Sequence, residues 1–245
     1  MSRILVPVKA VPLGAPVVRL GADGAPVEAR EWQLDPINAV AIEWAVRAPM
    51  EVRAVSIGHA AADVALRDAL ARGCDDVLRI EPDGNADLVS TAALLAAAAR
   101  RFDSQVLAFG YESYDASSGA LPAATAAALE WPLVSRVRSA RLDGGEMVAV
   151  RSRDAGLERV AVGPPAVLSF VEGEIVPRHP RLAAAIAVRR TAIPAVPAGL
   201  RVSSWTGGVR ALEPTPARQR QARRLAAADG IRELAALVAA PVEAR

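Results

Sequence analysis

Hydrophobic positions in the first 130 residues alternate between two spacings. Short continuous apolar runs, typical of buried strands, alternate with longer stretches in which apolar residues recur every three or four positions. This alternation predicts βα units, and therefore an α/β fold in which helices cover both faces of a parallel sheet. The expected strands are 3–8, 51–58, 76–80 and 105–110, and the expected helices are 36–44, 61–73, 86–102 and 123–131.

The start of the first helix is marked by Asp35 and Pro36. An aspartate side chain can accept hydrogen bonds from the free N–H groups of a helix start, and proline fits the first helical position. Upstream, Asp23-Gly24 is typical of a hairpin turn between 16–20 and 26–30. The apolar face of the expected helix consists of Ile37, Val40, Ala41 and Trp44.

The pattern changes after Leu133. Short apolar segments now follow one another across tight turns, without a helical stretch between them. This predicts an antiparallel extension of the sheet, followed by a loop that enters a short helix within 172–190. The expected strands of the extension are 133–142, 146–153, 157–163 and 165–171.

Residues 194–245 do not continue the α/β pattern. Prolines and glycines are frequent in 194–216, which indicates an extended arm, and two helix patterns follow at 217–228 and 231–238. An arm with an amphipathic tail usually packs on another surface. We therefore expect 1–193 to form the α/β domain and 194–245 to pack on a partner subunit. The apolar face of the tail consists of Ile231, Leu234, Leu237 and Val238.

The composition indicates where the chain works. Hydrophobic residues make up 52% of it, yet no run reaches the roughly 18 apolar residues of a membrane helix. The N-terminus lacks the pattern of a secretion signal, and the single cysteine, Cys74, has no partner for an internal disulfide. We expect a cytoplasmic protein that is not embedded in a membrane, with Cys74 buried as a small hydrophobic residue.

The sequence offers little chemistry for catalysis or metal binding. Neither histidine has metal-ligand spacing to another ligand, and the motifs of phosphate loops and serine hydrolases do not occur. Residues 181–245 carry 11 arginines against 4 acidic residues, but an arginine bias throughout the chain is typical of GC-rich coding. We therefore expect no catalytic residue, no metal and no nucleic-acid partner.

The segment Gly110–Pro122, GYESYDASSGALP, is the strongest candidate for a ligand site. It leads from an apolar strand into an alanine-rich helix, and helix starts attract phosphate through free N–H groups. Ligands of parallel sheets bind at the carboxyl ends of strands. The loop has serines and glycines but no Lys, Arg or Gly-x-Gly. It therefore has the backbone arrangement of a phosphate site but lacks the residues that usually bind the phosphate. The other candidate loops follow Val8, Gly58 and Ile80.

Several segments in combination resemble the β subunit of electron transfer flavoproteins, over about residues 3–193. The opening ILVPVKAVPLGAPVVRLGADG is similar to the family's first strand, lysine and hairpin, and LDPINAVAIEWAVR is similar to its Asn-Pro helix start. EVRAVSIGHA and ALRDALARGCDDVLRI resemble its next strand–helix–strand unit. LEWP and PAVLSFVEGEIVPRHPRLAAAIAVRR fall where the family has Leu-x-Trp-Pro and Pro-Arg-Tyr segments.

This resemblance implies a Rossmann-like fold of the adenine nucleotide alpha hydrolase type and a role in electron transfer. Such β subunits pair with an α subunit that carries most of the FAD site. The flavin takes electrons from a flavin or other dehydrogenase and passes them to a membrane quinone reductase, and the β subunit usually buries a structural AMP. The arginine bias is compatible with a divergent paralogue, such as the mycofactocin-associated group.

The resemblance also implies site residues. A leucine beside the family's Pro-Arg-Tyr segment docks dehydrogenases, and it maps to Leu182. The expected partner-docking residues are Arg178, Arg181 and Leu182. The expected cofactor-binding residues are Pro7, Asp35, Ile57, Gly110, Asp115, Ser117, Ser118 and Gly119.

The nucleotide loop departs from the family pattern. The family's Asn-Gln-Thr-Gly is 119–122 here, Pro122 offers no N–H, and Asp35 replaces an asparagine. If AMP is retained, we expect the N–H groups of 117–120 and the serine hydroxyls to hold its phosphate. Alternatively, Tyr111 and Tyr114 fill the pocket. Both alternatives predict weakened or absent AMP binding.

Two other classes of protein compete with this interpretation. The first is a stand-alone adenine-nucleotide-binding module that resembles universal stress proteins and regulates rather than transfers electrons. Such modules usually have a Gly-x-x-Gly stretch and lack a long arm, unlike this chain. The second is an enzyme of the ATP pyrophosphatase type, which would need a Ser-Gly-Gly-x-Asp-Ser loop after the first strand, where VPVKAVP stands.

Overall fold

The computed structural model describes residues 3–14, 29–84, 86–199 and 225–239. The chain divides into two compact units, Met1–Arg210 and Ala211–Arg245. The first unit contains a nine-stranded sheet. Its strands are β1 (Arg3–Pro7), β4 (Glu51–Ile57), β5 (Asp76–Glu81), β6 (Val106–Gly110), β7 (Leu133–Asp143), β8 (Glu146–Arg153), β9 (Gly156–Val162), β10 (Ala166–Phe170) and β11 (Ala195–Pro197). They lie in the order β11-β5-β4-β1-β6-β10-β7-β8-β9.

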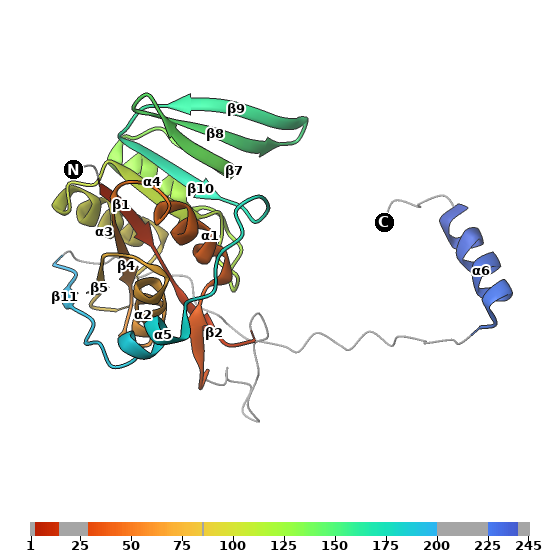
Figure 1. Ribbon diagram of the computed structural model, residues 1–245, viewed down its shortest axis with the longest axis horizontal. Helices are drawn as coiled ribbons and strands as arrows, with labels where there is room; N and C mark the ends of the chain where they lie inside the picture. The colour runs from red at the N-terminus through yellow and green to blue at the C-terminus, as the bar shows by residue number, and fades with distance from the viewer. Residues whose placement is uncertain (1–2, 15–28, 85, 200–224, 240–245) are drawn as a thin grey trace. The chain divides into compact units, whose positions relative to one another are not determined.

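Helices cover both faces of the sheet, as the alternating pattern predicts (Figure 1). The side chains of β1 alternate between two hydrophobic clusters: Ile4 and Val6 join the cluster around α1 and α2, while Leu5 joins the cluster around α3 and α4. The α/β fold class is therefore confirmed. The helices are α1 (Pro36–Ala45), the 3₁₀ helix η1 (Ala60–Ala62), α2 (Asp63–Arg72), α3 (Leu88–Arg101), α4 (Leu121–Leu129) and α5 (Leu182–Val188), which packs beside α2.

Helix α1 begins as the sequence predicts. Asp35 is its N-cap, and its carboxylate accepts a hydrogen bond from the Ile37 N–H at 2.9 Å. At the other end, the Trp44 ring lies 4.9 Å from the Phe170 ring, and its indole N–H donates to the Ala140 carbonyl at 2.9 Å. The helix is also buried beyond its apolar face, because the polar residues Asn38 and Glu43 are buried as well.

One strand contradicts the expected antiparallel extension. The sequence pattern predicts that 165–171 belongs to that extension, but β10 is parallel to both neighbours and lies between β6 and β7. All residues of β10 are buried. Its sequence, AVLSF, is apolar except for Ser169, as a strand covered on both faces requires. The antiparallel pairing of β7 with β8 and of β8 with β9 is confirmed.

The first residues of the expected arm form part of the sheet. Ala195–Pro197, as β11, pairs in parallel with β5 at the sheet edge. The two compact units divide between Arg210 and Ala211, and the boundary expected after 193 stays a prediction. The hairpin turn at Asp23-Gly24 lies outside the described residues, but β2 (Ala10–Pro12) and β3 (Trp32–Leu34) on either side of it pair antiparallel.

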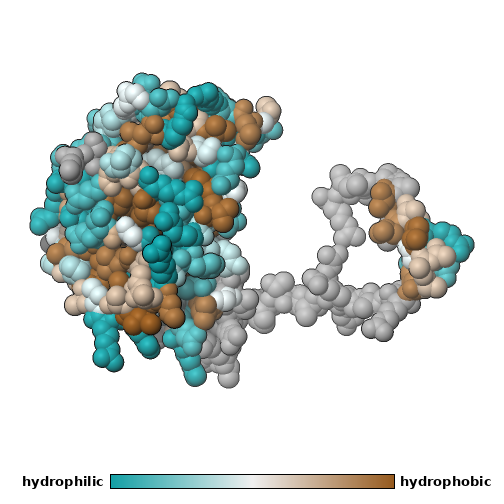
Figure 2. All heavy atoms as spheres, in the orientation of Figure 1, coloured by the Kyte–Doolittle hydropathy of each residue, from teal (hydrophilic) through white to brown (hydrophobic). Residues whose placement is uncertain are grey.

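The second unit, described by itself, contains α6 (Ala227–Ala239). This confirms the helix expected at 231–238, whereas most of the helix expected at 217–228 lies outside the described residues. The side chains of Ile231, Leu234 and Val238 are exposed, and Figure 2 shows the hydrophobic residues of α6 on one side of it.

Two expectations from composition can be compared with the structure. Cys74 is buried, as predicted, and this burial, with a smaller effect of Asp75, raises the pKa of its thiol to about 12. None of the helices in the described segments is both long enough and apolar enough to cross a membrane.

Candidate functional site

A cavity of about 470 Å³ lies at the carboxyl ends of the parallel strands. The ends of β1, β4 and β6 contribute to it, and so does the start of α3, which follows β5. The chain builds the sheet outward from β1 through β4 to β5, and then begins the other side of β1 with β6. Ligands of open α/β sheets bind at such a point of reversal, and the volume is within the range of about 300–1,000 Å³ for ligand sites.

The residues expected from the sequence divide into two groups. Those that line the cavity are Pro7, Ile57, Gly110, Ser118 and Gly119. The remaining three, Asp35, Asp115 and Ser117, are not among its lining residues. The contact of the first group with a cofactor stays a prediction.

Asp35 links two parts of the fold beside the cavity. It is fully buried, and besides capping α1 its carboxylate accepts a hydrogen bond from the Tyr114 N–H at 2.8 Å. Burial raises the pKa of this carboxyl, and the hydrogen bonds from Tyr114 and Ile37 offset the rise only in part. Asp35 therefore ties the loop after β6 to the start of α1.

Asp115 ties the same loop to the end of β1. Both of its carboxylate oxygens accept hydrogen bonds from Lys9 Nζ at 2.7 Å. Burial raises the pKa of Asp115, but the hydrogen bond and charge of Lys9 outweigh it, so the pKa lies below its usual value. Among the described residues that line the cavity, Lys9 is the one basic side chain, and its charge is already paired.

The loop presents backbone N–H groups at the start of α4. Ser117, at φ 47°, donates its N–H to the Ser113 carbonyl at 2.8 Å, so this N–H is already engaged within the loop, and the predicted contact of Ser117 with a phosphate stays a prediction. Within the described part of the chain, the N–H groups of Ser118, Gly119 and Ala120 donate to no protein oxygen. Free N–H groups at a helix start favour an anion.

Of the two tyrosines that the alternative places in the pocket, one lies at the cavity and one does not. Tyr111 lines the cavity without closing it, and the Arg136 guanidinium lies 5.5 Å from its ring centre. Tyr114 is 41% exposed and is not among the lining residues. The cavity therefore stays open.

Sequence reasoning missed Asn38, which also lines the cavity. Its side-chain oxygen accepts a hydrogen bond from the Lys9 N–H at 2.8 Å, so it fixes the backbone where β1 ends. A lone amide among the apolar residues of α1 was the available signal, because a buried polar side chain needs a partner.

Gly110 is needed because α1 approaches the end of β6 closely. A Cβ at 110 would lie 2.7 Å from Asn38 Nδ2 and 3.0 Å from the backbone carbonyl carbon of Ile37. We expect Gly110→Ala to lower the free energy of unfolding by about 1–3 kcal/mol, as overpacking does. Gly163→Ala is the matched control, because no atom lies within 4 Å of its Cβ position. Equal urea midpoints for the two variants would contradict this account.

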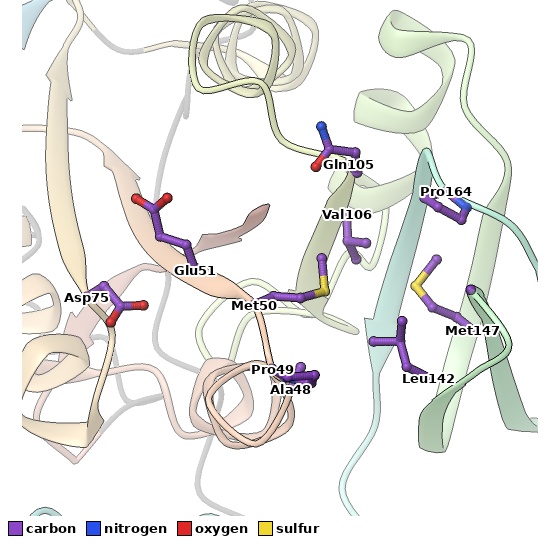
Figure 3. Close-up of a pocket in the computed structure, with 11 residues that line it drawn as sticks. Ala48, Pro49, Met50, Glu51, Asp75, Gln105, Val106, Leu142, Met147 and Pro164 are labelled. Atoms are coloured by element: carbon purple, nitrogen blue, oxygen red, sulfur yellow. The ribbon is translucent and has the colours of Figure 1, made fainter. Parts of the chain in front are cut away.

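A second cavity, of about 750 Å³, lies at the opposite, amino-terminal ends of the parallel strands. Met50 and Met147 point into it from opposite sides (Figure 3). Two of its polar groups are already engaged: Glu51 pairs with Arg3 at 2.9 Å, and Asp75 accepts a hydrogen bond from the Val52 N–H at 2.8 Å. We assign no ligand to it. The described residues contain no group of three or more side chains that could hold a metal ion.

Residues 176–186, here called the docking segment because the sequence resemblance predicts docking there, present large apolar side chains to solvent. Val176 is 70% exposed, Leu182 77% and Ile186 62%, and Figure 2 shows hydrophobic residues at the surface where Figure 1 places α5. Arg181 is exposed at the start of α5. Arg178 instead pairs with the buried carboxylate of Glu43 at 2.8 Å, so its charge is not free to steer a partner.

Comparisons with known proteins identify the family. The electron transfer flavoprotein domain matches residues 24–199. Three proteins named electron transfer flavoprotein subunit beta are similar to the chain. The protein from Thermoanaerobacterium thermosaccharolyticum is 29% identical over 155 residues, 61% of this chain and 60% of its own. That from Bradyrhizobium diazoefficiens is 28% identical over 174 residues, 68% and 70% of the two chains. That from Mycobacterium bovis is 29% identical over 175 residues, 66% of each.

The chain belongs to the electron transfer flavoprotein β-subunit family. It spans 60% to 70% of the length of these relatives. The domain match includes β3 to β11, and with them the loop after β6 and the docking segment, but not β1. The identities of 28% and 29% agree with the expectation of a divergent member.

Proposed function

We propose that the chain is the β subunit of a heterodimeric electron transfer flavoprotein, which shuttles electrons from a dehydrogenase to an acceptor. The observation that supports this most is the family match over residues 24–199, which includes most of the α/β unit. In this proposal an α subunit holds most of the FAD, and the bound flavin supplies the redox chemistry. The chain itself binds and positions, and is not an enzyme.

Three titratable groups near the cavity, Lys9, Asp115 and Asp87, support a binding role. Lys9 and Asp115 neutralise each other, and Asp87 caps α3 by accepting a hydrogen bond from the Ser90 N–H at 2.7 Å. A general acid or base needs a proton-transfer group directed at the substrate, whereas these groups serve the fold. We therefore assign electron transfer to the complex with the α subunit and not to this chain alone.

The cavity suits an adenine nucleotide in size and position but offers few groups to hold its phosphate. Its size and its position at the strand ends suit a small ligand of this kind. A phosphate would depend on the N–H groups of Ser118, Gly119 and Ala120, because Lys9 is held by Asp115 and Pro122 has no N–H. We therefore propose AMP as the ligand of this cavity, bound weakly.

The nucleotide content of the purified complex tests this expectation. We expect denaturation to release FAD with less than one AMP per FAD, because the described residues that line the cavity offer the phosphate no unpaired side-chain cation. The released nucleotides can be quantified by chromatography against standards. An AMP content equal to that of FAD after extended dialysis would contradict weak binding.

The docking segment supports a dehydrogenase as the electron donor. Its exposed leucine, Leu182, stands beside an exposed arginine, Arg181. An apolar anchor with a positive neighbour suits an acidic partner surface, because charge raises the association rate while the anchor slows dissociation. The acceptor in this proposal is a membrane quinone reductase. A place in the mycofactocin-associated group is compatible with the arginine bias of the chain.

Co-expression with the α-type subunit of the same system tests the pairing. We expect the two chains to elute together from a sizing column as a heterodimer. If the chain elutes as a monomer beside a well-expressed α-type subunit, and binds ATP on its own, the stand-alone nucleotide-binding module takes the place of this proposal.

A further inference from the structure

The backbone of the docking segment is fastened to α1 and α2. Glu43, on α1, accepts a hydrogen bond from the Arg178 N–H at 3.0 Å. From α2, the Arg72 guanidinium donates to the Arg178 carbonyl at 2.7 Å. The Arg47 guanidinium approaches the Val176 carbonyl at 3.5 Å. The peptide groups on both sides of residue 178 are thus hydrogen-bonded to side chains of α1 and α2. The apolar side chains of the segment remain exposed to solvent.

The Arg178 side chain completes the attachment. Its Nε lies 2.9 Å from both carboxylate oxygens of Glu43, and a second guanidinium nitrogen lies 2.8 Å from Oε1. The Arg47 Nε donates to the same Oε1 at 2.7 Å. Glu43 is 2% exposed, and a buried carboxylate is costly unless it is paired and hydrogen-bonded in this way. Arginine–carboxylate forks fix orientation as well as distance.

The attachment persists at neutral pH. Burial pushes the pKa of Glu43 upward, but the hydrogen bonds from Arg178 and Arg47 outweigh it, so the pKa lies below its usual value. A lowered carboxyl pKa means that the contribution to stability is complete above the unfolded pKa of about 4.3 and is lost only as pH falls further. The segment is therefore held in one arrangement under working conditions.

We infer that Glu43 is a positioning residue that fixes the docking segment in its binding conformation before a partner arrives. This inference rests on the proposed function, because it assigns docking to Leu182. Ordering a loop in advance removes that entropic cost from binding. The leucine would thus be presented by a rigid base built on α1, although Glu43 itself touches no partner.

A spin label on the docking segment tests the positioning role without any partner. The chain has one cysteine, Cys74, whose thiol is buried with a pKa raised to about 12, so a nitroxide on Leu182→Cys reports on that position alone. We expect a restricted spectrum for the full chain, a mobile spectrum after Arg178→Gln or Glu43→Gln, and partial restriction after Arg178→Lys. Arg141→Gln is the matched control, because Arg141 is also 55% exposed and pairs with an exposed carboxylate, Asp143.

Donor kinetics with the unlabelled complex add a readout of function. We expect Arg178→Gln to raise KM for the electron-donating dehydrogenase roughly two- to tenfold, the cost of ordering the loop on binding, with kcat unchanged. Identical spin-label spectra in Arg178→Gln and Arg141→Gln would overturn the inference, and so would an unchanged KM despite a mobile label. If no dehydrogenase reduces even the parent complex, the proposed function fails, while the spectra still decide whether Glu43 holds the segment.

Discussion

Deletion of residues 200–245 is expected to abolish co-purification with the α-type subunit while the α/β unit stays folded. The sheet survives because β11 ends at Pro197, before the deletion begins. The deletion removes the exposed apolar residues Ile231, Leu234 and Val238. Burial of each such side chain is worth about 1.5–3 kcal/mol, so their combined loss weakens association by orders of magnitude.

Point variants separate the apolar face from the rest of this tail. We expect Leu234→Ser in the full chain to weaken the complex measurably, and Arg232→Ala, at a neighbouring position where the side chain is 78% exposed, to leave it intact. Thermal unfolding of the truncated chain provides the folding control. A truncated chain that still forms a full-strength complex would show that the tail is not the partner contact.

Leu182→Ala is expected to slow electron transfer from the dehydrogenase without loss of FAD. A leucine that is 77% exposed contributes little to the fold, whereas an apolar anchor at the centre of an interface costs about 2 kcal/mol or more when truncated. That corresponds to roughly a 30-fold rise in KM for the donor. Stopped-flow reduction of the complex at varied donor concentration measures it.

Leu157→Ala is the matched control for this substitution. Leu157 is 64% exposed and lies on β9, at the far edge of the sheet from α5. We expect its reduction kinetics to equal those of the parent complex. If Leu182→Ala also matches the parent, Leu182 has no docking role and the exposed face of α5 needs another explanation.

The order of elements could be predicted from the sequence because it depends on local patterns. The Asp35 cap and the βα alternation are contained in a few neighbouring residues each, and the structure has both. The position of β10 could not be predicted in this way. Its insertion between β6 and β7 is a long-range pairing, and the turn signals on either side of it suggest an antiparallel neighbour equally well.

The location of the candidate site could be predicted from the sequence, but most of its side-chain contacts could not. Parallel topology alone brings the strand ends together, so Pro7, Ile57 and Gly110 line one cavity. Which side chains pair across it depends on tertiary contacts between distant residues. The Lys9–Asp115 pair joins residues 106 positions apart, and the attachment of Arg178 to Glu43 joins residues 135 positions apart. Neither contact leaves a signal in the local pattern.

The FAD content of the co-purified complex tests the central claim most directly. The chain and its α-type subunit would be purified together, and the flavin absorbance compared with the protein concentration of the heterodimer. The account predicts a yellow complex that contains about one FAD per heterodimer and is bleached when an electron donor is added. A stable complex without flavin, or a flavin that no donor reduces, would contradict it.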